Sequence, residues 1–123
     1  MITINLDKSE NRVFLILNGV IRKSEAATNL KRFFEALQHL DDNFTIITDL
    51  SGLRLNANEE LLLLINLHLK TQELFKVGRV IRVVGKSKPL LVYLSKLDQK
   101  NNLSNIHYVP TINDAIEFDK KVA

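Results

Sequence analysis

The chain has 123 residues, of which 46% are apolar and 25% charged, and its formal net charge is +3, values that are ordinary for one globular domain. It contains no cysteine, which excludes disulfides, thiolate metal sites and cysteine nucleophiles. No signal-peptide pattern opens the sequence, and its longest apolar run, residues 61–65, is far short of the ~20 residues that span a bilayer, so we expect a soluble cytoplasmic single domain over residues 1–123.

Two strands open the chain. Residues 2–6 alternate apolar and polar side chains, which is typical of a strand with one buried face. The nearly continuous apolar run of residues 12–19 indicates a second, more central strand. The polar loop of about five residues between them favours a hairpin.

A helix and a third strand follow. Ser24 stands where it could cap the helix. We expect the helix to end near residues 41–43 and a strand over residues 44–48 to come next. Apolar residues recur at helical spacing on one face: Leu30, Phe33, Phe34, Leu37 and Leu40.

The segment 49–60 is the strongest candidate for a binding site. Asp49 ends the strand and Ser51 follows it, and the carboxyl ends of strands are where α/β proteins commonly build sites. An alternative interpretation gives Asp49 the local role of capping the turn through Ser51 or the next glycine. Asn56 could cap the second helix, with Glu59 placed as a capping box requires.

The second helix is apolar nearly all round, and such a helix is buried on more than one side. Either it lies deep within the fold with a few exposed leucines, or it contacts a further partner: a second subunit, another protein or a lipophilic ligand. Gly78 marks its exit. The apolar residues are Leu61, Leu62, Leu63, Leu64, Ile65, Leu67 and Leu69.

The last third predicts two further strand–helix units. Residues 80–84 are rich in β-branched side chains, and Pro89 suits the first turn of a third helix that ends near Asn101. A short strand over 106–109 precedes a fourth helix, with Thr111 as its cap. We expect these apolar side chains to face inward: Leu90, Leu91, Leu94 and Leu97 of the third helix, and Ile112, Ala115, Ile116 and Val122 of the fourth.

The predicted order is therefore ββαβαβαβα. Each helix after the hairpin returns the chain to a neighbouring strand, and right-handed crossovers then give a mostly parallel sheet with one antiparallel edge strand. The sequence predicts a single α/β domain with flanking helices. The connections are short, so we expect no domain boundary.

Basic residues concentrate in one stretch, opposed there by Asp98 alone. They form either a patch for an acidic partner, a phosphate or an anionic membrane surface, or the solvated outer faces of a strand and a helix. Aromatic side chains do not interleave with them as a base-stacking platform requires, so we expect no nucleic-acid partner. The residues are Lys76, Arg79, Arg82, Lys86, Lys88, Lys96 and Lys100.

Little in the sequence indicates catalysis. The turn with Lys86, Ser87 and Lys88 could bind an anion at a helix start, or be a simple basic turn; a P-loop would need a glycine where Val80 stands. The three histidines, His39, His68 and His107, lie on different elements without metal-ligand spacing. We expect His68 to be a partly buried structural or interface histidine. We predict no metal, no cofactor and no enzymatic activity.

The order of elements and their punctuation resemble the STAS domain family, the fold of bacterial anti-anti-sigma factors and of the cytoplasmic domains of sulphate transporters. The resemblance covers nearly the whole chain. Residues 19–30 are similar to the segment that leads into the family's first helix, residues 46–53 to the strand and loop before its phosphorylation site, and residues 108–115 to its closing strand and helix.

The chain departs from the family at its regulatory motif. The family carries Asp-Ser-Ser/Thr-Gly at the start of the second helix, whereas this chain has residues 56–59, Asn-Ala-Asn-Glu, in that region. A kinase needs a hydroxyl there, at a helix N-terminus that tolerates new negative charge. We therefore expect the phosphorylation switch to be absent or moved.

Two functional hypotheses result. The first is a non-catalytic regulatory domain of anti-anti-sigma type, which docks to a kinase-like or other sigma-pathway protein through Asp49, Ser51, Asn56, Asn58 and Glu59. The second is motivated by the excess of leucine on the second helix, and the chain also resembles SpoIIAA-like domains, a related branch that lacks the motif and is linked to lipophilic ligands. It predicts a lipophilic-ligand-binding domain or a homodimer formed through the leucine-rich second helix.

Overall fold

The computed structural model describes residues 1–54, 59–103 and 105–122. A central sheet has five strands in the order β1-β2-β3-β4-β5. The first pair is antiparallel and the other three pairs are parallel. The strands are β1 (Ile2–Asp7), β2 (Arg12–Leu17), β3 (Phe44–Asp49), β4 (Val77–Val83) and β5 (Ile106–Val109).

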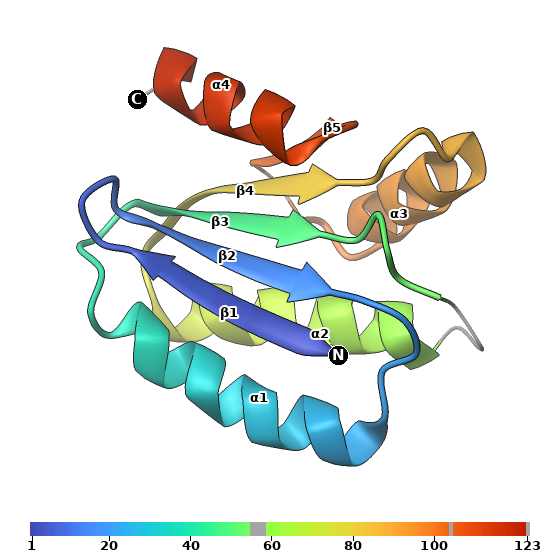
Figure 1. Cartoon of the computed structure of the whole chain (residues 1–123), viewed down its shortest axis with the longest axis horizontal. Helices are drawn as coiled ribbons and strands as arrows, with labels where there is room; N and C mark the ends of the chain where they lie inside the picture. Colours follow the sequence, from blue (N-terminus) through green and yellow to red (C-terminus); the bar gives the residue numbers. More distant parts are fainter. Residues whose placement is uncertain (55–58, 104, 123) are drawn as a thin grey trace.

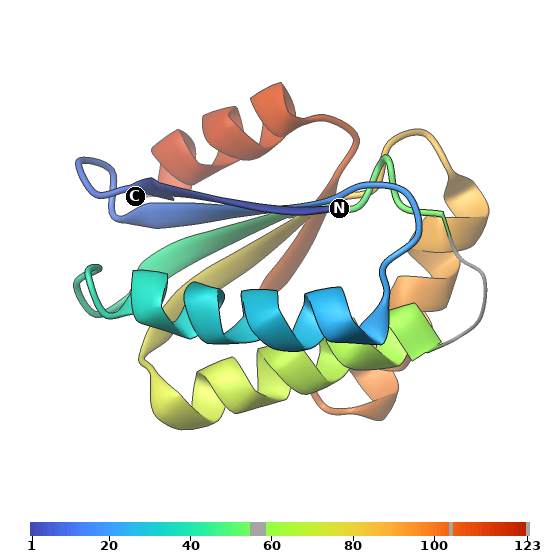
Figure 2. The ribbon, with the colours of Figure 1, turned by 60° about the horizontal axis from the view of Figure 1, so that its bottom comes forward.

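Helices cover both faces of the sheet. Figure 2 shows α1, α2 and α3 on one face and α4 on the other. The element order is ββαβαβαβα, so the predicted mixed sheet with an antiparallel edge is confirmed (Figure 1). The helices are α1 (Lys23–Leu37), α2 (Glu59–Leu74), α3 (Lys88–Lys100) and α4 (Ile112–Val122).

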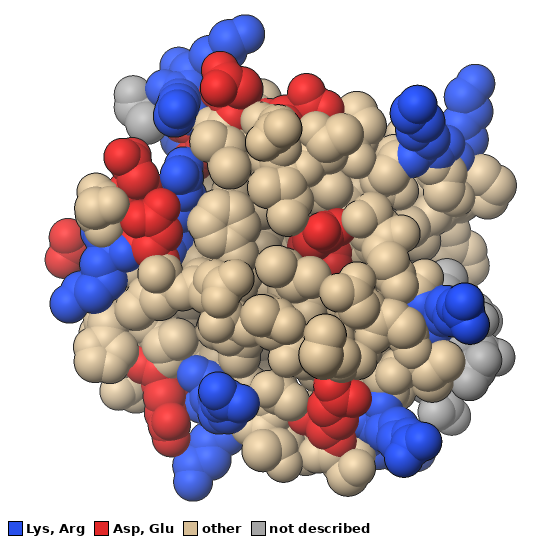
Figure 3. Space-filling view, in the orientation of Figure 1, with Lys and Arg blue, Asp and Glu red and all other residues tan. Residues whose placement is uncertain are grey.

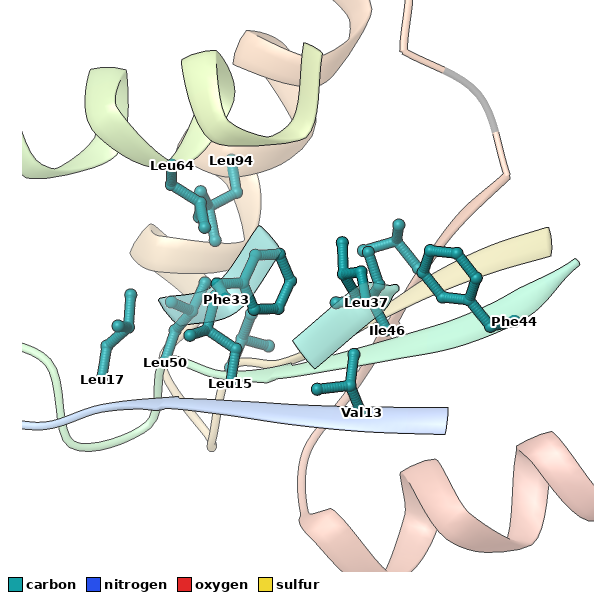
Figure 4. Packing of buried hydrophobic residues seen from close by; sticks show 12 residues of the cluster. Val13, Leu15, Leu17, Phe33, Leu37, Phe44, Ile46, Leu50, Leu64 and Leu94 are labelled. Carbon is teal, nitrogen blue, oxygen red and sulfur yellow. The ribbon is translucent and has the colours of Figure 1, made fainter. Parts of the chain in front are cut away.

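The larger core lies between the sheet and the three-helix face. Figure 4 shows Leu15 and Val13 of β2 facing Phe33 and Leu37 of α1, with Leu64 of α2 packed nearby. Because β2 and β3 are covered on both faces of the sheet, their sequences are nearly continuous apolar runs. A smaller cluster on the other face joins α4 to the sheet.

Ion pairs to one aspartate fasten α4 to the sheet. Asp119 is 5% exposed and accepts hydrogen bonds from Thr45 Oγ1 at 2.8 Å, Arg79 Nη1 at 2.8 Å and Arg12 Nη1 at 3.4 Å. Three neighbouring strands, β2, β3 and β4, thus share one carboxylate. The predicted cap of α4 is confirmed, because the Asp114 amide donates to Thr111 Oγ1 at 3.1 Å.

Several sequence predictions about local structure are wrong. Helix α1 begins at Lys23, and its N-cap is Arg22 rather than Ser24, without a side-chain cap hydrogen bond. It ends at Leu37, so Leu40 lies beyond it, packed against the core. Val122 is 46% exposed instead of facing inward.

The predicted role of Gly78 is also wrong. It lies inside β4, not at the exit of α2. A Cβ at this position would overlap the carbonyl oxygen of Asn43, so this glycine permits a close approach of two backbones. None of the described helices is long and apolar enough to cross a membrane.

Candidate functional site

The loops that follow β2, β3 and β4 meet at the carboxyl ends of these strands. We call this surface, residues 18–22, 50–54 and 84–88, the carboxyl edge. The Gly19 amide donates to the Gly52 carbonyl at 2.8 Å, and the Arg54 amide donates to the Gly19 carbonyl at 2.8 Å. Because these bonds pair Gly19 with Leu53 as a short bridge, the loop after β2 holds the loop after β3 in place.

Asp49 fixes the turn after β3. Its Oδ1 accepts from the Ser51 amide at 3.0 Å and from Ser51 Oγ at 2.6 Å. The local capping role predicted for Asp49 is therefore confirmed. The Ser51 side chain is exposed, but its hydroxyl is engaged within the turn.

The loop after β4 lies beside this turn. A Cβ on Gly85, whose φ is +67°, would stand 3.5 Å from the Cβ of Ser51. The candidate anion-binding residues, Lys86, Ser87 and Lys88, directly follow Gly85 in the chain and are exposed. Ser87 is the N-cap of α3, and its Oγ accepts from the Leu90 amide at 3.3 Å.

Of three predicted docking residues, Asn56, Asn58 and Glu59, only Glu59 lies within the described part of the chain. Asn56 and Asn58 lie outside the described residues, and so does the predicted capping box of Asn56 with Glu59. Glu59 is the first residue of α2. Asp49 and Ser51 remain as the described core of the site.

The basic stretch does not form one patch. Arg79 is bound to Asp119, and Lys76 Nζ lies 3.9 Å from Asp42 Oδ2. Figure 3 shows Lys and Arg side chains in separate groups around the rim of the face in view. Lys86 and Lys96 are exposed.

Arg82 contradicts both interpretations of the basic stretch, because it is only 1% exposed. Its Nη2 lies 3.1 Å from Asp98 Oδ1, and the Tyr108 hydroxyl donates to Asp98 Oδ2. Burial lowers the pKa of Arg82, and Asp98 and then Tyr108 oppose that effect. The ion pair of Arg82 and Asp98 therefore joins β4 to α3 on the face of the sheet that three helices cover. This role is structural.

His68 lies close to this ion pair and is 7% exposed. Burial, and then the positive charge of Arg82, lower its pKa from 6.5 to about 4. The imidazole is therefore neutral at pH 7, as expected for a structural histidine. Among the described residues, no group of three or more His, Asp and Glu side chains could hold a metal ion.

Sequence reasoning missed a cavity. A space of about 770 Å³ lies between α1, α2 and the first two strands. Most of its lining is hydrocarbon, including Leu17, Phe34 and Leu67. The surplus of leucine on α2 was the sequence signal, but a surplus does not tell a filled core from a hollow one.

The fold is that of known anti-sigma factor antagonists. The structure is similar to that of the anti-sigma factor antagonist SpoIIAA in its unphosphorylated form, with a TM-score of 0.65 and 11% identity over 100% of both chains. It is also similar to an anti-sigma factor antagonist from Mycobacterium paratuberculosis, with a TM-score of 0.61, 16% identity, and coverage of 98% of this chain and 95% of the other. No protein-family model and no curated protein sequence matches the chain. The predicted STAS-like, SpoIIAA-like fold is confirmed.

Proposed function

We propose that this chain is a non-catalytic regulatory domain that docks to a protein of a sigma-factor pathway through its carboxyl edge. The observation that supports this proposal most strongly is the structural similarity to two anti-sigma factor antagonists over 98–100% of this chain. A protein with this role needs a preformed surface rather than a catalytic constellation.

The geometry of the carboxyl edge supports docking. Backbone hydrogen bonds tie Gly19 to Gly52 and Arg54, and the Asp49 side chain ties down Ser51. A surface held in this way loses little conformational freedom on binding, which favours affinity. The exposed side chains of Ser51, Arg54 and Lys86 provide polar groups on this surface for a partner to contact.

We further propose that docking at this surface does not depend on phosphorylation at the family's usual position. Residues 56–58 carry no hydroxyl. Ser51 carries the described hydroxyl that is nearest to these residues in the sequence, and this hydroxyl donates to Asp49 Oδ1 at 2.6 Å. A phosphate on Ser51 would break this bond and place like charges together.

The test is binding to purified anti-sigma factors by isothermal titration calorimetry. Arg54→Glu and Lys86→Glu reverse exposed charges on the carboxyl edge. We expect the pair to lower affinity at least about tenfold, equivalent to ~1.4 kcal/mol. Lys8→Glu is the matched control, because Lys8 lies in the β1–β2 turn at the opposite end of the strands. The proposal would be contradicted if the Lys8→Glu control lost affinity while the edge variant kept the affinity of the wild type.

A second candidate function is the binding of a lipophilic ligand or self-association through α2. The apolar cavity between α1 and α2 favours it, as do the exposed leucines Leu63, Leu69 and Leu74, which are 38%, 40% and 53% exposed. Native mass spectrometry reports both: a retained ligand as added mass, and a homodimer as doubled mass. A bare monomer would count against this function.

A further inference from the structure

The cavity between α1 and α2 has the size of a ligand site. Its volume is about 770 Å³, within the ~300–1,000 Å³ that small-molecule pockets occupy. The space opens to solvent, because Leu30 and Leu63 of its lining are each 38% exposed. A space this large with hydrocarbon walls therefore favours the transfer of an apolar ligand out of water.

The shape of the cavity suits a slender ligand. Its α1 wall runs from Lys23 to Phe34, which is roughly 17 Å at ~1.5 Å per residue. At its bottom, Leu15 and Phe33 are only 3% and 1% exposed, so apolar side chains close the space against the sheet. A hydrocarbon chain laid along α1 would contact apolar side chains over most of this length.

Basic side chains stand at the rims of the cavity, and the nearby Glu25 carboxylate is engaged by the Ile2 amide at 2.7 Å. Among the described lining residues the charged side chains are Lys23 and Lys70, and the polar ones are Asn29 and Asn66. Both lysines are exposed. Lys70 Nζ lies 3.9 Å from Glu73 Oε2, but both side chains are largely in solvent, and such a pair is weak. The helix rims therefore complement an anionic head group.

We propose that this cavity binds a single-chain acyl carboxylate, with the hydrocarbon chain lying over the sheet and the carboxylate at the rim, near Lys23 or Lys70. This inference rests on the second proposed function, lipophilic-ligand binding, and adds the chemical class of the ligand. The ligand also contacts Leu53, which lines the cavity and belongs to the carboxyl edge.

The test compares two probes with the same chain and different heads. Palmitate and hexadecanol are titrated into the full chain with a bound fluorescent fatty acid as the displaced reporter. We expect palmitate to bind more tightly than hexadecanol. The double variant Lys23→Glu/Lys70→Glu lowers palmitate affinity about tenfold, equivalent to ~1.4 kcal/mol, and leaves hexadecanol unchanged. The control Lys8→Glu/Lys96→Glu reverses two exposed charges outside the cavity and leaves both probes unchanged.

A second variant tests the location. Ala26 lines the cavity, whereas Thr28 is exposed on the same helix and does not line it. Ala26→Phe fills the cavity and removes binding of both probes, and Thr28→Phe does not. Thermal unfolding followed by circular dichroism verifies that both variants fold. Wild-type binding by a folded Ala26→Phe variant would overturn the assigned site.

The outcomes separate the two levels of the proposal. Equal affinities for palmitate and hexadecanol, or no effect of the double lysine variant, overturn the carboxylate inference and leave the lipophilic-ligand function standing. If neither probe binds the wild-type chain, the lipophilic-ligand function fails together with the inference.

Discussion

Replacing His68 should change how stability depends on pH. This histidine is 7% exposed, and its pKa falls from 6.5 to about 4 because of burial and the charge of Arg82. In the unfolded chain it takes up a proton near pH 6.5, whereas the folded chain resists protonation until about pH 4. The unfolded state therefore binds more protons in this window, so stability falls as the pH falls.

The size of the effect follows from the two pKa values, 6.5 and about 4. At ~1.36 kcal/mol per pKa unit, the full loss is about 3 kcal/mol, complete below pH ~4, and about 2 kcal/mol of it appears between pH 7 and pH 5. Above pH 6.5 the contribution is fully present. His68→Leu removes this term, so its stability should depend less steeply on pH than that of the wild type.

The assay is urea unfolding of wild type and His68→Leu at pH 7, 6 and 5. We expect the difference in unfolding free energy between them to shift by about 2 kcal/mol across this range. His39→Leu is the control, because His39 is exposed. A difference between wild type and His68→Leu that is constant with pH would refute the assignment of a buried, neutral imidazole.

Three further predictions concern the packing. Asp119→Ala leaves the buried Arg12 guanidinium with Asp7 as its remaining carboxylate partner and should lower the unfolding free energy by about 3 kcal/mol, measured by urea unfolding. A loss no larger than that of an exposed carboxylate would contradict this role. Gly78→Ala pushes a Cβ into the Asn43 carbonyl and should cost about 1–3 kcal/mol in the same assay, whereas a neutral effect would rule out the close approach. For the buried pair, Arg82→Met should destabilise more than the double variant Arg82→Met/Asp98→Leu, because the single change leaves an uncompensated carboxylate; additive losses in this cycle would refute the coupling.

The order of the elements could be predicted because local signals agree with the fold. Periodicity located all five strands, and Pro89 and Thr111 marked helix starts correctly. The prediction of Ser24 as the cap is wrong, because Arg22, two residues earlier, occupies the cap position. A cap residue close to a helix start cannot by itself fix the first turn.

The burial of Arg82 has a signal in the sequence. Val80, Arg82 and Val84 alternate along the chain and share one face of the sheet, and both valines are buried. Asp98 stands one helical turn after buried Leu94. Two opposite charges on inward faces predict a buried pair, whereas counting basic residues along the stretch treats all of them as exposed.

Other features could not be predicted from sequence. Asp119 meets Arg12, Thr45 and Arg79 across three strands, and no local spacing indicates that meeting. The cavity depends on how far α1 stands from α2, a result of packing rather than of composition. The sequence indicated the turn of Asp49 and Ser51 and the turn of residues 86–88 separately, but not that the loop after β2 joins them, because the pairing of Gly19 with Leu53 connects distant segments.

The most direct test of docking through the carboxyl edge is amide chemical-shift mapping of the chain by NMR as a purified anti-sigma factor is added. The account predicts that the largest shifts occur at the carboxyl edge, around Gly19, Ser51, Arg54 and Gly85. Shifts confined to the β1–β2 turn, residues 8–11, or to α4 would contradict it.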